Sequence, residues 1–120
     1  MDNRKQTEDG SSRMTLTELV EITGLSFVEL SRLLDLTDPA LKKYLRAGQT
    51  WNADVIEHVR YLQQVFDKGV DTFGSIQEFR AWLSHEHAFL RVQPYDLLNS
   101  ISGINLVIEE LIRIDHGITV

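Results

Sequence analysis

The sequence contains no cysteine, so it can form no disulfide and offers no thiolate ligand for a metal. It also has no apolar run of the roughly 18 residues that a membrane-spanning helix requires. Residues 1–6 lack the apolar segment of a secretory signal peptide. From these absences we expect a cytoplasmic protein with no membrane partner.

Positive charge is not in excess either. The chain has 12 basic and 18 acidic residues, which give a formal net charge of -6. Because coating of nucleic acid depends on neutralising phosphates, this balance argues against a protein that covers nucleic acid without specificity. A local basic surface on an acidic body is compatible with the same count.

Signatures of enzymes and metal sites are missing as well. The sequence has no glycine-rich phosphate loop and no Ser/His/Asp arrangement that spacing alone can place. His85-Glu86-His87 would put its two rings on opposite sides of a helix, and no third ligand lies at a helpful spacing. Glu109-Glu110 is typical of a solvated pair on a helix. We therefore expect no enzyme, no cofactor and no metal.

From residue 15 onward the chain has the pattern of consecutive helices. Three pairs have capping-box spacing, in which a Ser or Thr and a Glu three residues later exchange hydrogen bonds: Thr15 with Glu18, Ser26 with Glu29, and Ser75 with Glu78. Asp38, followed by Pro39, and Asn52 are the predicted N-caps of two further helices. No segment alternates apolar and polar residues long enough for a strand. The predicted fold class is all-α.

The pattern divides the chain into three parts. Residues 1–14 are polar and aperiodic, and we expect a disordered tail there. The helix that starts after Asn52 is expected to end at Lys68-Gly69, and residues 69–74 form the clearest connector. The prediction is thus a helix-turn-helix bundle over 15–70 and a small helical module over 75–120, whose final helix runs from Ile104 to His116.

Residues 27–48 have the pattern of a helix-turn-helix, with Asp35-Leu36-Thr37 as the turn. Asp35 stands where the backbone of such turns is left-handed, a conformation that Asp tolerates better than most residues. The second helix has a polar and basic outer face made of Thr37, Lys42, Lys43 and Arg46. In a major groove these side chains would contact phosphates and base edges. We predict operator binding there by a homodimer on paired half-sites; a solvated basic face without DNA contact is the alternative.

The last forty residues carry a motif whose parts follow in a fixed order. These parts are Trp82-Leu83, Pro94-Tyr95-Asp96-Leu97-Leu98, Gly103, Val107, Leu111-Ile112-Arg113-Ile114 and Gly117. The segment resembles the C-terminal toxin-binding domain of the Xre/MbcA/ParS-type antitoxins, and the helix-turn-helix ahead of it matches the architecture of that family. Between the first two parts the family often carries a proline and Gly-Gly, whereas this chain has His85-Glu86-His87 and Arg91-Val92-Gln93.

The resemblance implies an antitoxin of a type II toxin–antitoxin module. In this family the toxin is commonly a RES-domain enzyme that consumes NAD, the C-terminal region covers the substrate entrance of the toxin, and the helix-turn-helix represses the operon. The candidate toxin-binding residues are Trp82, Ile112, Arg113, Ile118 and Val120. A stand-alone transcriptional regulator with a C-terminal dimerisation module is the alternative function, and an adaptor for another partner comes third.

Overall fold

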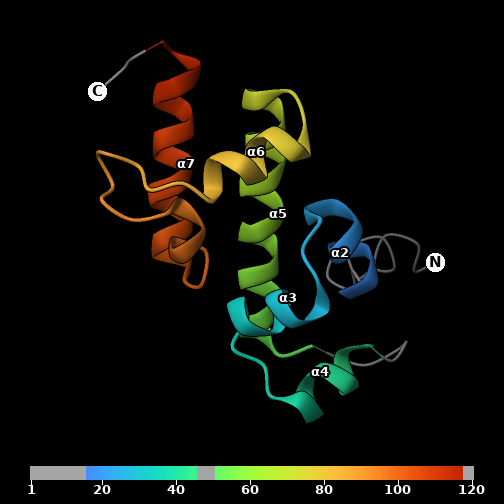
Figure 1. Cartoon of the computed structure of the whole chain (residues 1–120). Helices are drawn as coiled ribbons and strands as arrows, with labels where there is room; N and C mark the ends of the chain where they lie inside the picture. Colours follow the sequence, from blue (N-terminus) through green and yellow to red (C-terminus); the bar gives the residue numbers. More distant parts are fainter. Residues whose placement is uncertain (1–15, 46–50, 118–120) are drawn as a thin grey trace, which may run out of the picture.

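The structure, a computed structural model, describes residues 16–45 and 51–117, and within them the chain is helical without a strand (Figure 1). The predicted all-α class is therefore confirmed for these residues. Their elements are α2 (Leu16–Thr23), α3 (Phe27–Leu33), α4 (Asp38–Leu45), α5 (Ala53–Phe73), α6 (Ile76–Leu83), the 3-10 helix η1 (Pro94–Leu97) and α7 (Ile101–Asp115). None of these helices is long and apolar enough to cross a membrane.

The 21-residue helix α5 is the centre of the fold. Figure 1 shows it between α7 on one side and α2 on the other, with α4 at the end of the molecule remote from α6. Along α5 the buried Val59, Leu62 and Val65 join one apolar core that includes Leu16 and Leu19 of α2 and Val107 and Leu111 of α7. One core therefore links the N-terminal helices to the C-terminal motif. The division into separate domains stays a prediction.

Helix α5 continues past Lys68-Gly69, where we expected it to end, and stops at Phe73. Gly74, with a left-handed φ of 91°, is the actual C-cap, and its N–H donates to the Val70 carbonyl oxygen at 2.7 Å. Gly69 is buried inside the helix, and a Cβ there would lie 2.4 Å from the Phe79 ring. The glycine therefore permits close packing of α6 on α5; it does not end the helix.

Local capping signals predicted several helix starts correctly. Ser26 and Glu29 form the expected capping box, with reciprocal bonds of 3.0 and 3.1 Å. The Ser75 and Asn52 side chains accept bonds from the first turns of α6 and α5. The cap of α4 was assigned wrongly, because the Ala40 N–H donates to the Thr37 hydroxyl at 3.3 Å and Asp38 already lies in the helix. Thr15 lies outside the described residues.

The final helix begins one turn earlier than predicted. It starts at Ile101, and the Ser100 hydroxyl accepts a 3.0 Å bond from the N–H of Gly103. Gly103 thus lies in the first turn, packed against the Leu97 carbonyl of η1. At its other end α7 is joined to α5 by the ion pair of Lys68 with Asp115. The hydrogen bond from Lys68 lowers the pKa of the Asp115 carboxyl below its ordinary value.

Candidate functional site

Helices α3 and α4 are joined by a tight turn with the predicted backbone conformation. Asp35 is left-handed, with a φ of 57°, as the helix-turn-helix pattern required at this position. The N–H of Leu36 donates to the Ser31 carbonyl oxygen at 2.8 Å, which fixes the chain as it leaves α3. This conformation is compatible with a helix-turn-helix, although DNA contact is a separate proposal.

The basic face predicted on α4 is exposed. Lys42 and Lys43 point to solvent and make no ion pair with any other described residue, so their ammonium groups are available to a phosphate. The buried Tyr44 holds the helix in place, because its hydroxyl accepts a 3.1 Å bond from the N–H of Asn52 and its ring packs on Trp51. Thr37 is exposed, with its hydroxyl engaged as the cap of α4. Arg46 lies outside the described residues.

Trp82 belongs to an aromatic cluster between α5, α6 and the following loop. Its ring centroid lies 5.4 Å from that of Phe73, 6.1 Å from that of Phe79 and 5.8 Å from that of His87. The side chain is half-buried. The structure thus gives Trp82 a packing role, and contact with a toxin stays a prediction for this residue.

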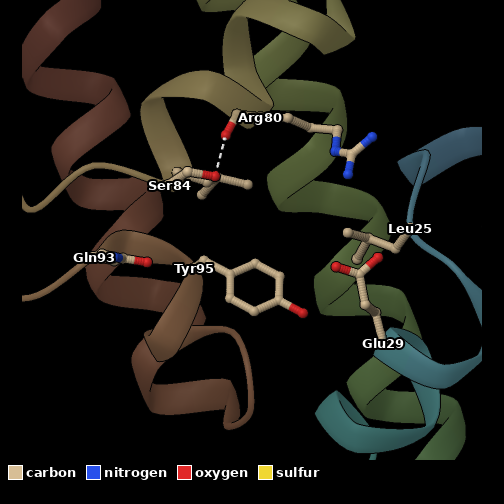
Figure 2. Close-up of a pocket in the computed structure, with 7 residues that line it drawn as sticks. Leu25, Glu29, Arg80, Ser84, Gln93 and Tyr95 are labelled. Atoms are coloured by element: carbon tan, nitrogen blue, oxygen red, sulfur yellow. Dashed lines mark hydrogen bonds between the residues drawn. The ribbon is translucent and has the colours of Figure 1, made fainter.

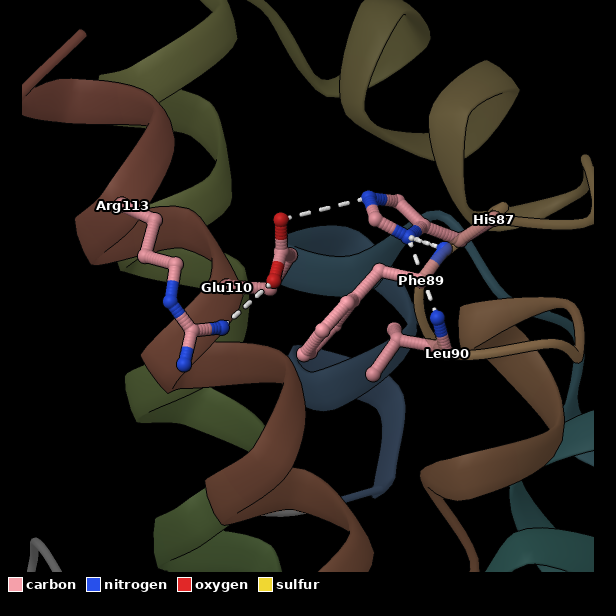
Figure 3. Close-up of polar contacts among 5 residues, drawn as sticks. All are labelled: His87, Phe89, Leu90, Glu110 and Arg113. Atoms are coloured by element: carbon pink, nitrogen blue, oxygen red, sulfur yellow. Dashed lines mark hydrogen bonds and ion pairs between the residues drawn. The ribbon is translucent and has the colours of Figure 1, made fainter. Parts of the chain in front are cut away.

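Glu110 is a buried carboxylate on α7, whereas we expected a solvated pair with Glu109. Its side chain is 2% exposed, its Oε1 lies 2.8 Å from Arg113 Nη1, and its Oε2 lies 3.2 Å from His87 Nε2 (Figure 3). Glu109 is exposed as expected. Glu110 is buried because it follows Val107 by three residues and so shares the inward face of α7. That spacing was a signal in the sequence that we missed.

The tautomer of His87 follows from its partners. The N–H groups of Phe89 and Leu90 both donate to His87 Nδ1, at 3.1 and 3.3 Å, so Nδ1 carries no proton. The proton must then be on Nε2, which donates it to Glu110. His87 is thus the centre of the loop that connects α6 to η1, and it anchors this loop on α7.

The other candidate toxin contacts fall in different places. Arg113 is only partly free, because it pairs with Glu110 and its Cζ lies 5.2 Å from the Phe89 ring centroid. Ile112 is exposed on α7, which leaves it available to a partner. Ile118 and Val120 lie outside the described residues. Sequence reasoning missed Phe89, a residue that is 52% exposed.

A small hollow of about 150 Å³ separates the N-terminal helices from α6 and η1, and it is lined by Leu25, Glu29, Arg80, Leu83, Ser84, Gln93 and Tyr95 (Figure 2). Figure 2 shows Tyr95 pointing across it toward Glu29. The Tyr95 hydroxyl is buried and has no hydrogen-bond partner among the described residues. Burial, and then the nearby Glu29 carboxylate, raises the pKa of Tyr95.

Tyr95→Phe is expected to leave the free energy of unfolding unchanged or to raise it by up to about 1 kcal/mol, since it removes an unpartnered buried hydroxyl. In the wild type, the raised pKa means that stability is unaffected below the ordinary tyrosine pKa and falls as pH rises through the raised value. Urea unfolding at neutral and alkaline pH measures both effects. The matched control, Tyr44→Phe, loses the bond to Asn52 and should cost about 1 kcal/mol. A larger loss for Tyr95→Phe than for Tyr44→Phe would contradict this interpretation.

A comparison with known protein families identifies a domain in the C-terminal part of the chain. Residues 68–117 match the model of the antitoxin Xre/MbcA/ParS C-terminal toxin-binding domain. The match confirms the resemblance over this range, which is less than half of the chain. No curated protein matches the chain. The matched range contains the end of α5, the aromatic cluster, the His87 loop and α7, whereas the basic face of α4 lies outside it.

Proposed function

We propose that the chain is the antitoxin of a type II toxin–antitoxin system, acting in the cytoplasm on two partners. Its C-terminal domain binds and inhibits a cognate toxin of the NAD-consuming RES-domain class. Its α3–α4 pair binds operator DNA as part of a homodimer and represses the operon. The observation that carries the proposal is the match of residues 68–117 to a toxin-binding antitoxin domain.

The DNA-binding half of the proposal is supported by the N-terminal helices. The left-handed Asp35 gives the turn a conformation suited to a helix-turn-helix, and α4 exposes Lys42 and Lys43 on an otherwise acidic protein. Such a surface favours specific, salt-sensitive binding over general coating, because the body of the molecule repels phosphates. One such helix reads few bases, and therefore a dimer on two half-sites is expected.

Replacing Lys42, Lys43 and Arg46 together with alanine should weaken operator binding at least about 100-fold and make it less steeply dependent on salt, because three cationic contacts are lost. Toxin neutralisation should be unchanged, since these residues lie outside the matched range. Fluorescence anisotropy with operator DNA and a growth-rescue assay with the toxin measure the two activities separately.

The control for this experiment is Arg91→Gly, which removes a positive charge from the loop before η1 while suiting the local φ of 66°. It should bind operator DNA like the wild type. An operator affinity unchanged by the triple substitution would refute DNA binding by α4. Joint loss of DNA binding and neutralisation in a folded triple variant would refute the separation of the two activities.

A further inference from the structure

We propose that Phe89, presented by the loop of residues 84–93, is the anchor that inserts into an apolar hollow on the toxin. This inference rests on the proposed function and names a residue that determines the fit of the antitoxin to its partner. It concerns residues between two parts of the sequence motif, so the motif itself does not specify them.

The first observation is the exposure of the ring. Phe89 is 52% exposed, and Val92 of the same loop is also exposed. An exposed aromatic side chain is a candidate contact residue, because aromatic side chains supply much of the binding energy at interfaces. Phe89 is the one aromatic residue among the exposed large hydrophobic residues of the matched domain, over its described part.

The second observation is that hydrogen bonds within the loop hold its backbone. Around Phe89 the His87 ring accepts the N–H groups of Phe89 and Leu90 (Figure 3). The backbone N–H of His87 donates to the Val92 carbonyl oxygen at 3.0 Å, and the backbone N–H of Arg91 donates to the His87 carbonyl oxygen at 2.7 Å. Because its backbone is held in this way, the loop loses little conformational freedom on binding, which favours affinity.

The third observation is the support beneath the ring. Glu110 pairs with both His87 and Arg113, and the Arg113 guanidinium covers one face of the Phe89 ring. These three residues are therefore positioning residues for Phe89. Glu110 is itself a buried residue of α7, so its contact with His87 also links the loop to that helix.

The occupant is a toxin because the loop and its support both lie inside the toxin-binding domain. The charges beside the ring are already paired, since Glu110 offsets Arg113. The contact surface on the toxin should therefore be an apolar hollow of about one phenyl ring, with no need for a charge opposite Arg113.

The test uses the full chain and the purified cognate toxin of the proposed RES-domain class, with affinity measured by calorimetry. Phe89→Ala should weaken binding at least about 30-fold, as expected for an interface anchor. Phe89→Leu, which keeps part of the apolar bulk, should lie between this variant and the wild type. Val28→Ala removes a more exposed apolar side chain from α3, outside the matched domain, and should bind like the wild type.

The outcomes separate this inference from the proposed function. Wild-type binding with a Phe89→Ala affinity within threefold of it would overturn the inference and leave the antitoxin proposal standing. Failure of the folded wild-type chain to bind the toxin would refute both. Conversion of a wild-type dimer to a monomer by Phe89→Ala would assign the ring to contact between copies and overturn the inference. His87→Ala should lower affinity and speed amide exchange at Phe89 and Leu90, whereas unchanged exchange would contradict its positioning role.

Discussion

Gly103→Ala is expected to destabilise the protein by about 3 kcal/mol or more, because the added methyl group meets backbone and not a movable side chain. An ideal Cβ at this position would lie 2.1 Å from the Leu97 carbonyl oxygen and 2.9 Å from its carbonyl carbon. To relieve the overlap, α7 must separate from η1, which would disturb the core around Leu98 and Ile104. Urea unfolding followed by circular dichroism measures the loss.

The neighbouring Ser102→Ala is the matched control for this substitution. Ser102 is exposed in the same helical turn, so the change tests helix propensity without the steric overlap. Its unfolding free energy should stay within about 0.5 kcal/mol of the wild-type value. Equal stability of the Gly103→Ala and Ser102→Ala proteins would show that α7 and η1 do not approach as closely as described.

Gly69→Ala is expected to cost about 2–3 kcal/mol, although alanine is the better helix former by about 1 kcal/mol. The two effects have opposite signs, and packing should dominate because the added Cβ would lie within 2.5 Å of three atoms of the Phe79 ring. That ring is fully buried and is held by Phe66, Phe73 and Trp82, so it has little room to move. Thermal unfolding of the variant and the wild type shows directly whether Gly69→Ala lowers or raises the stability.

A double-mutant cycle identifies the cause of this loss. Phe79→Leu should be destabilising alone, and Gly69→Ala should cost less in the Phe79→Leu background than in the wild type, because the smaller side chain makes room for the methyl group. Gln64→Ala on the exposed face of α5 is the control for helix propensity. A Gly69→Ala protein more stable than the wild type would mean that propensity dominates and that the packing described here is wrong.

Features determined by neighbouring residues were predictable from the sequence. The capping residues Ser26, Asn52 and Ser75 were identified correctly because their partners lie two or three positions away. The left-handed Asp35 followed from the spacing of the turn. The proline at position 39 predicts Asp38 as the cap of α4, whereas the cap is Thr37, one residue earlier.

Features that depend on distant partners were not predictable in the same way. Gly69 resembles a helix end in the sequence because glycine is typical of that position. Its packing role depends on Phe79, which lies on another helix and is not evident from the local sequence. Glu110 is buried against His87, 23 positions earlier in the chain. Phe89 lies in a loop, where hydrophobic periodicity gives no information, and its exposure depends on the bonds that His87 makes. The family motif located the toxin-binding domain, whereas the surface that we propose to contact the toxin required the structure.

The most direct test of the proposed function measures NAD consumption by the proposed cognate RES-domain toxin, with and without the purified full chain. Inhibition should rise with the added chain and become complete at a fixed stoichiometric ratio, because we propose that binding by the C-terminal domain blocks the enzyme. Full toxin activity in the presence of excess folded chain would contradict it, and would favour the alternative of a transcriptional regulator that uses its C-terminal helices only to dimerise.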